Sequence, residues 1–301
     1  MTQPVLALVG PTASGKSALA MAVGRVHSDV ELVSVDSMQV YRGMDIGTAK
    51  PSPAEQAEVP HHGIDLADPS ELVTVVRYRD AVDEALAGIA ARGHRAVLVG
   101  GTGLYLRAVT DRLEPPGRWP EIRAELDAEA DPAMLYGRLA AVDPAAAAKI
   151  DPANHRRTAR ALEVCLGSGR PFSTFGPGLD SYPPTPVVQF GLRWPRAVLA
   201  ERITARYESM MAAGFLEEVR RLPAKISRSA GQALGYRELR EHLDGRTSLD
   251  EAIALSIART RRFATRQERW FRRDPRIRWI DLDSDPLTAF PTVLGALPAC
   301  V

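Results

Sequence analysis

A glycine-rich stretch near the amino terminus has the residue types and the spacing that bind phosphate. It reads GPTASGKS over residues 10–17, follows the apolar run at residues 5–9 and precedes a helical pattern from Ala18. This is the P-loop pattern G-x-x-x-x-G-K-[ST] in the strand-then-helix context that the motif requires. Its glycines let backbone N–H groups and the positive end of the helix point at phosphate oxygens. We therefore predict a phosphate site formed by Gly10, Pro11, Thr12, Ala13, Ser14, Gly15, Lys16 and Ser17.

Two side chains of this stretch have distinct chemistry. Lys16 is expected to bring a positive charge to the terminal phosphate, and the Ser17 hydroxyl is placed to hold Mg²⁺. The motif does not identify the ligand, because kinases, nucleotide hydrolases and transferases with a diphosphate leaving group all use it.

Asp36 is a catalytic candidate by position, because it follows the apolar run at residues 32–35. Carboxyl ends of parallel strands line the ligand crevice of an open sheet, so Asp36 is expected near the phosphate site. It could cap a helix, bind Mg²⁺ as a Walker-B aspartate does, or act as a general base. Its early position counts against the Walker-B role. The later run at residues 95–99 ends in Gly-Gly-Thr-Gly without an aspartate, which argues against hydrolysis of ATP or GTP.

The elements that must position these residues are expected to form an α/β fold, a P-loop NTPase-like parallel sheet flanked by helices. Strands are predicted from apolar runs at residues 5–9, 32–35, 95–99, 187–193 and 276–281. Helical periodicity predicts long helices at about 17–26, 74–92, 195–211 and 249–273, and a shorter one that ends near 243. Residues 37–73, rich in glycine and proline, are expected to form an irregular functional loop.

The sequence also predicts a helical insertion domain. Residues 119–170 carry helical patterns broken by Asp-Pro pairs, and turn-rich stretches flank them on both sides. We place the first part of the P-loop core at 1–111, the insert at 112–186, and the second part of the core, with a basic carboxyl-terminal helix, at 187–301.

Charge is distributed unevenly along the chain. The 301 residues have a formal net charge of +1, but residues 259–278 contain nine arginines against Glu268 and Asp274. Such a local positive field suits phosphates, including those of a nucleic acid. The alternative is a charged helix face that is simply solvated.

Other classes of site are disfavoured by the sequence. Cys165 and Cys300 are too few and too far apart for a disulfide framework, so we expect reduced thiols. His61-His62 lacks partners at the spacing of a zinc site. No apolar run approaches the length of roughly 18 residues that a membrane span needs, and we expect a cytoplasmic protein.

Seven motifs in register resemble those of the bacterial tRNA dimethylallyltransferases. They are GPTASGKS at 10–17, SVDS at 34–37, QVYRGMDIGTAKP at 39–51, GGTGLY at 100–105, RALEV at 160–164, GYR at 235–237, and Arg266-Gln267 followed by Trp270-Phe271. The resemblance covers nearly the whole chain. It implies transfer of a dimethylallyl group from its diphosphate to N6 of the adenine immediately 3′ of the anticodon, in tRNAs that read codons beginning with U.

The resemblance also implies roles for single residues. Asp36 would accept the proton from N6, and Lys16 and Arg237 would assist the reaction, with Mg²⁺ as the cofactor. The partners would be dimethylallyl diphosphate and the anticodon stem-loop of tRNA, bound by a monomer. Whether Arg237 contacts diphosphate or RNA stays open. By similarity, the contacts to tRNA would come from Asp36, Ser37, Met38, Gln39, Thr102, Arg123, Arg156, Arg157, Arg160, Gly235, Tyr236 and Arg237.

The sequence departs from the family pattern at two positions. Thr265 and Arg269 stand where many members have Lys and Thr, which affects details of RNA contact. Three other functions remain alternatives: an adenylate isopentenyltransferase that acts on free AMP, a small-molecule kinase with the same loop, and an RNA-binding protein without catalysis.

Overall fold

The computed structural model describes residues 5–113, 115–175, 178–179 and 181–298. Its contacts divide the chain into two compact units, which are described separately. One comprises Met1–Arg112 with Tyr182–Val301, and the other comprises Leu113–Ser181. The predicted insert at 112–186 overlaps the second unit and extends a few residues beyond it at its carboxyl end.

The larger unit is built on a six-stranded parallel sheet with the strand order β3-β2-β4-β1-β5-β6. Every residue of β1 and β2 is buried, as expected for a parallel sheet with helices on both faces. The predicted α/β fold is therefore confirmed. The strands are β1 (Leu6–Val9), β2 (Val30–Ser34), β3 (His61–His62), β4 (Arg95–Gly100), β5 (Val188–Arg193) and β6 (Ile277–Asp281).

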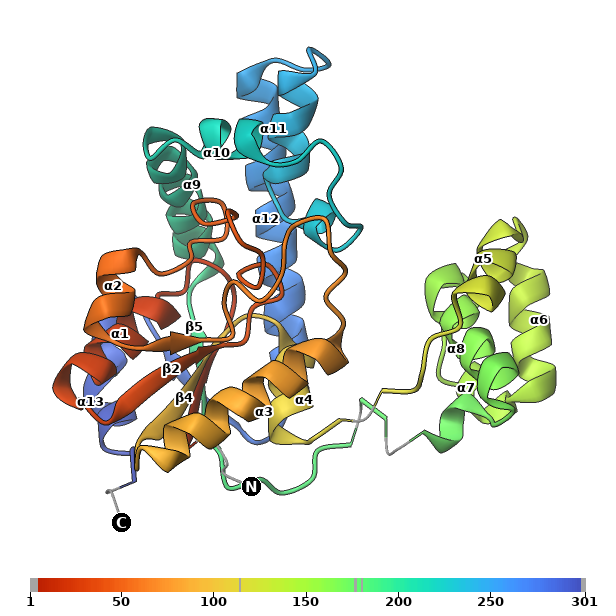
Figure 1. The fold of residues 1–301 in the computed structure, drawn as a ribbon, viewed down its shortest axis with the longest axis horizontal. Helices are drawn as coiled ribbons and strands as arrows, with labels where there is room; N and C mark the ends of the chain where they lie inside the picture. Colours follow the sequence, from red (N-terminus) through yellow and green to blue (C-terminus); the bar gives the residue numbers. More distant parts are fainter. Residues whose placement is uncertain (1–4, 114, 176–177, 180, 299–301) are drawn as a thin grey trace. The chain divides into compact units, whose positions relative to one another are not determined.

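Helices cover the sheet on both faces because right-handed crossovers run in opposite directions from its centre. Helix α1 (Lys16–Val26) connects β1 to β2 and lies with α13 (Phe290–Leu294) at one side (Figure 1). Helix α3 (Val75–Ala91) connects β3 to β4 and packs with α4 (Gly103–Thr110) on the other (Figure 1). The reversal of direction between β4 and β1 creates the crevice where such folds bind ligands.

Four further helices rise together beyond the carboxyl ends of the strands (Figure 1). Helix α12 has buried residues at spacings of three and four, among them Ser256, Thr260 and Gln267, and it begins with a capping box at Ser248. These helices are α9 (Arg196–Ala212), α10 (Phe215–Arg221), α11 (Tyr236–Leu243) and α12 (Leu249–Phe271).

The prediction that residues 37–73 are wholly irregular was wrong. Within them lie α2 (Pro53–Glu58), which Ser52 caps, and the edge strand β3, which pairs with β2. Both are too short to show periodicity, and β3 consists of two polar residues. Cys165 is a buried free cysteine, and Cys300 lies outside the described residues.

The smaller unit is helical and has a hydrophobic core of its own. Its core includes Leu135, Leu139, Ala159 and Leu162. Pro follows the cap residue of three of its helices, so the Asp-Pro and Trp-Pro pairs mark helix starts. The helices are α5 (Pro120–Ala128), α6 (Pro132–Val142), α7 (Pro144–Ala147) and α8 (His155–Ser168). No helix in the described part of the chain is long and apolar enough to cross a membrane.

Candidate active site

The predicted phosphate loop forms a tight cradle between β1 and α1. Gly10 and Gly15 have φ values of +142° and +88°, which L side chains rarely adopt. A Cβ atom at Gly10 would lie 2.9 Å from the carbonyl oxygen of Leu192, so the neighbouring strand leaves no space for one. Lys16 Nζ donates to the carbonyl oxygen of Pro11 at 2.7 Å and therefore curls back along the loop.

Side chains from two distant segments brace this loop. Trp194, just after β5, donates from Nε1 to the carbonyl oxygen of Ser14 at 3.0 Å. Arg202 on α9 stacks on Trp194 and donates to the carbonyl oxygen of Ala13 at 2.9 Å. These contacts hold the loop by its carbonyl oxygens.

Gln267 of α12 connects the phosphate loop to the turn after β4. Its Oε1 accepts from the backbone N–H of Thr12 at 2.9 Å, and its Nε2 donates to the carbonyl oxygen of Gly101 at 2.9 Å. The glycine turn that stands in place of a Walker-B aspartate is thereby part of the same site.

A cavity of about 880 Å³ lies against these residues. Its lining includes the loop residues 12–17, Asp36 beyond β2, Gly100–Thr102 after β4, Arg206 of α9 and Gln267 of α12. The predicted phosphate-binding and catalytic residues Lys16, Ser17 and Asp36 are therefore brought together, whereas Arg237 is not among the lining residues.

Lys16, Arg206 and Asp36 are charged side chains that line this cavity. Lys16 is 9% exposed, and burial, followed by the charge of Arg206, lowers its pKa to about 7, although Asp36 acts in the opposite direction. Burial also lowers the pKa of Arg206, again opposed by Asp36. No ion pair within the described ranges neutralises Lys16 or Arg206, so the cavity is suited to a multiply charged anion.

Asp36 caps a turn and not a helix. Its Oδ1 accepts from the backbone N–H of Met38 at 2.9 Å, and the next helix in the chain is α2. Thr102 accepts from the backbone N–H of Ser37 at 3.0 Å, which joins the ends of β2 and β4. The second carboxylate oxygen makes no hydrogen bond to a described residue and remains available to a ligand.

Gln39 forms part of the cavity wall. It accepts from the Ser34 hydroxyl at 2.7 Å and donates from Nε2 to the carbonyl oxygens of Thr48 and Ala49 at 3.2 and 3.0 Å. Its amide is therefore fully engaged with the protein.

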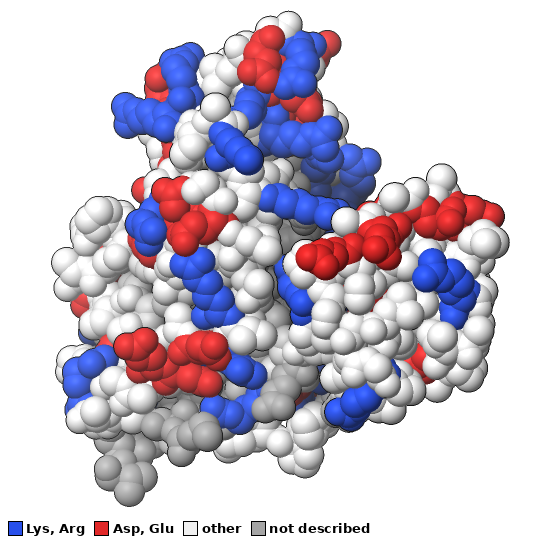
Figure 2. All heavy atoms as spheres, turned by 45° about the vertical axis from the view of Figure 1, so that its right-hand side comes forward, with Lys and Arg blue, Asp and Glu red and all other residues white. Residues whose placement is uncertain are grey.

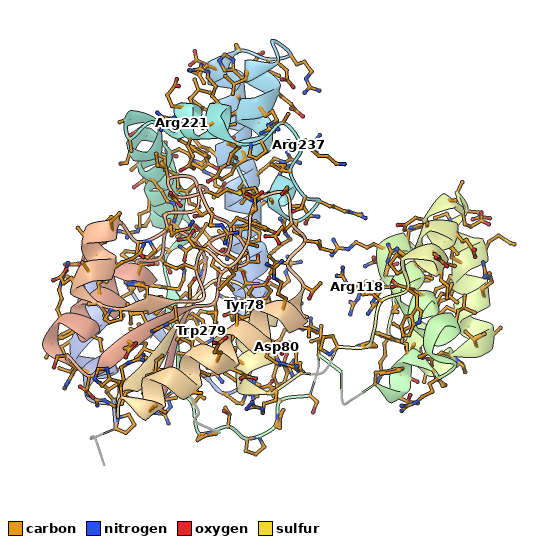
Figure 3. The ribbon with its side chains drawn as sticks, in the orientation of Figure 1. Tyr78, Asp80, Arg118, Arg221, Arg237 and Trp279 are labelled. Atoms are coloured by element: carbon orange, nitrogen blue, oxygen red, sulfur yellow. The ribbon has the colours of Figure 1, made fainter. Side chains whose placement is uncertain are left out.

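Arg237 lies in a neighbouring basic cavity of about 450 Å³. Arg259, Arg262 and Arg266 also line it, and Arg266 and residues 232–234 line both cavities. Arg237 is paired with Glu241 at 3.0 Å, its side chain is 61% exposed, and it projects from the first turn of α11 (Figure 3). Lys and Arg side chains gather on the face that carries α11 and α12 (Figure 2).

The predicted RNA contacts of the smaller unit fall into two groups. Arg160 donates to the carbonyl oxygens of Pro116 and Gly117 and pairs with Glu163, and Arg123 pairs with Asp127. The exposed side chains of Arg156 and Arg157 make no hydrogen bond or ion pair with the described residues. Arg156 and Arg157 are thus placed to bind an external anion. Arg123 and Arg160 instead form contacts within the smaller unit.

Trp194, Arg202 and Arg206 were not predicted from the sequence. The sequence places the two arginines one helical turn apart on the helix predicted after the strand at 187–193, but only the structure shows that this strand, β5, is adjacent to β1. A cation after a strand beside the phosphate loop is a candidate for the same site.

Ser17 is the side chain expected to hold the magnesium ion. Within the described ranges, no group of three His, Cys, Asp or Glu side chains could hold a metal ion. Mg²⁺ commonly takes one or two protein ligands and completes its shell with substrate phosphates and water. Ser17 in the cavity is compatible with that mode of binding.

Two family models match the chain. The IPP transferase model matches residues 39–274, and the isopentenyl transferase model matches residues 3–62.

Relatives at high identity cover nearly the whole sequence. The tRNA dimethylallyltransferase of Kineococcus radiotolerans is 49% identical over 308 residues, covering 98% of this chain and 96% of the relative. That of Streptomyces coelicolor is 46% identical, covering 92% and 89%.

Solved structures agree in fold. The full-length tRNA isopentenylpyrophosphate transferase of Bacillus halodurans has a TM-score of 0.70 at 36% identity, covering 98% of this chain and 97% of that one. A eukaryotic dimethylallyltransferase acting on tRNA has a TM-score of 0.78 at 26% identity, covering 97% of this chain and 76% of that one.

Proposed function

The chain belongs to the tRNA dimethylallyltransferases of the IPP transferase family, and from this premise we propose how its own residues carry out the transfer. The donor is dimethylallyl diphosphate, and the acceptor is N6 of the adenine immediately 3′ of the anticodon in tRNAs that read codons beginning with U. The supporting observation is the single cavity that holds Lys16, Arg206 and Asp36.

The cationic side of the cavity binds the diphosphate. The N–H groups of Ala13 and of residues 15–17, with the side chains of Lys16 and Arg206, stabilise the negative charge that grows on diphosphate as the bond between the allylic carbon and oxygen breaks. Ser17 would hold Mg²⁺, which would neutralise further charge on the leaving group.

Asp36 receives the proton from the acceptor. The amino group of adenine is a weak nucleophile because its lone pair is delocalised into the ring. As N6 forms its bond to the allylic carbon, the free carboxylate oxygen of Asp36 takes the N6 proton, and diphosphate leaves with the electrons of the broken bond.

Transfer requires the adenine to leave its stacked position. This costs a few kcal/mol, less in a loop than in a duplex. The basic cavity with Arg237 and Arg266 adjoins the reaction cavity, and we assign it to RNA phosphates. Arg156 and Arg157 of the smaller unit are assigned to further phosphate contacts, and the protein is proposed to act as a cytoplasmic monomer.

Label transfer tests the reaction and the acceptor together. The purified protein is incubated with Mg²⁺, radiolabelled dimethylallyl diphosphate and either unmodified tRNA or AMP, and the labelled nucleosides are identified after nuclease digestion. Label in N6-dimethylallyladenosine from tRNA alone is expected. A matched tRNA with guanosine immediately 3′ of the anticodon should remain unlabelled. Label from AMP alone would identify the free-nucleotide enzyme, and no label from either acceptor would refute prenyl transfer.

A further inference from the structure

One carboxylate outside the reaction cavity accepts four hydrogen bonds from two segments that are distant in sequence. Glu218 of α10 accepts from the backbone N–H groups of Asp45 and Ile46 at 2.9 and 2.7 Å and from that of Gly47 at 3.1 Å. It also accepts from the Tyr236 hydroxyl at 2.6 Å. The three successive backbone N–H groups form an anion-binding turn. The anion bound in this turn is the carboxylate of Glu218.

The loop that Glu218 holds is a wall of the reaction cavity. Residues 47–51 line that cavity, and Gln39 holds the backbone carbonyls of Thr48 and Ala49 from the side of β2. Lys50, whose side chain is 2% exposed, donates to Asp45, Asp65 and the carbonyl oxygen of Tyr41. The wall is therefore fixed internally by Lys50, to β2 by Gln39 and to α10 by Glu218.

Close packing supports the same connection. A Cβ atom at Gly47 would lie 2.2 Å from Phe215 and 2.5 Å from Tyr236, and these two rings pack edge to face. Burial and the adjacent Glu218 raise the pKa of Tyr236 far above its usual range, so its hydroxyl stays protonated and continues to donate. Because Tyr236 immediately precedes Arg237, Glu218 joins the wall of the reaction cavity to the start of α11.

We propose that Glu218 is a positioning residue for the transfer. Its carboxylate fixes residues 45–47, and through them the cavity wall at 47–51, relative to Tyr236, which immediately precedes Arg237 of the basic cavity. It touches neither substrate. Displacing a reactant by about 1 Å can cost on the order of 100-fold in rate, so a loosened wall should slow turnover. The kinetic part of this inference rests on the proposed function.

Three variants and a control separate positioning from a general loss of stability. Glu218→Gln and Glu218→Ala remove the carboxylate, and Tyr236→Phe removes one donor. Glu217→Gln is the matched control, because Glu217 is on the same helix, is exposed and pairs only with Arg220 within the described part of the chain. Hydrogen exchange of the amides of Asp45, Ile46 and Gly47 is measured well below the melting temperature, together with kcat and the KM of each substrate per folded molecule.

We expect Glu218→Gln to speed exchange at these amides at least tenfold and to lower kcat at least tenfold, with smaller changes in either KM. Glu218→Ala should have larger effects, Tyr236→Phe smaller ones, and Glu217→Gln none. Unchanged exchange in both Glu218 variants would overturn the inference, as would faster exchange with kcat within twofold of the unaltered protein. If the unaltered protein forms no product, the proposed function fails, and the exchange data still decide whether Glu218 holds the wall.

Discussion

In the proposed mechanism, Asp36 acts on the acceptor and Lys16 on the donor. Asp36 presents a carboxylate oxygen to which no described residue donates a hydrogen bond, and the buried amino group of Lys16 forms no ion pair with a described residue. Their types and spacing were enough to predict both from the sequence. Arg206 was missed because a single arginine within an amphipathic helix looks like a surface residue until its burial is known.

Asp36→Asn should lower kcat by about 10²- to 10⁴-fold, the usual contribution of a general base. The asparagine Oδ1 can still accept from the N–H of Met38, so the turn should persist and the affinity for tRNA should change less than threefold. Single-turnover rates and tRNA binding measure the two effects. A rate within twofold of the unaltered protein would remove Asp36 from the role of base.

The lowered pKa of Lys16 leads us to expect that donor binding weakens as the pH rises. Since its pKa is lowered to about 7, the ligand-free protein loses this charge as the pH passes through that value. An anionic donor binds the protonated form, so its Kd should rise by up to about tenfold per pH unit above neutrality. Calorimetry between pH 6 and 9 can measure this. Lys16→Met should flatten the profile, and identical slopes in the two proteins would show that Lys16 does not supply the charge.

At the scale of elements, α12 supplies the connection between the phosphate loop and the turn after β4. The sequence predicted the long helices and the buried strands, because periodic apolar residues determine both. It did not predict β3, α10 or α13, since two to seven residues carry too little pattern. Nor did it indicate that Gln267, in the buried stripe of α12, bridges two loops.

Gln267→Leu should lower the free energy of unfolding by about 1–3 kcal/mol, because it leaves the N–H of Thr12 and the carbonyl of Gly101 without their partner. The KM for the donor should rise as the loop loosens. Urea denaturation and steady-state kinetics measure these effects. Thr265→Ala, an exposed position on the same helix, should change stability by less than about 0.5 kcal/mol. Equal stability of both variants would argue against the bridge.

At the scale of the molecule, the separate cores of the two units indicate that the larger one folds without the insert. Its core contains the sheet and the helices around it, whereas residues 113–181 have a core of their own. Arg276 contacts the larger unit on both sides of the insert, since it pairs with Asp111 and donates to the carbonyl oxygen of Pro183. Sequence composition predicted the insert from its turn-rich flanks, but the contacts that anchor those flanks are tertiary and left no local signal.

Replacing residues 113–181 by a short Gly-Ser linker should leave the larger unit folded and able to bind dimethylallyl diphosphate. Its affinity for tRNA should fall at least tenfold, because Arg156 and Arg157 are lost. Circular dichroism, calorimetry with the donor and filter binding of tRNA measure these three properties. Undiminished tRNA binding would mean that the insert contributes no essential contact.

The central claim is that one cavity binds the donor at residues 10–17 and the acceptor adenine at Asp36. Its most direct test is a crystal structure with Mg²⁺, an unreactive thiolo analogue of dimethylallyl diphosphate and an anticodon stem-loop. We predict diphosphate on the N–H groups of the loop, Ser17 beside the metal ion, and N6 within about 3 Å of the Asp36 carboxylate. A diphosphate bound elsewhere, or an adenine out of reach of Asp36 in this complex, would contradict this account.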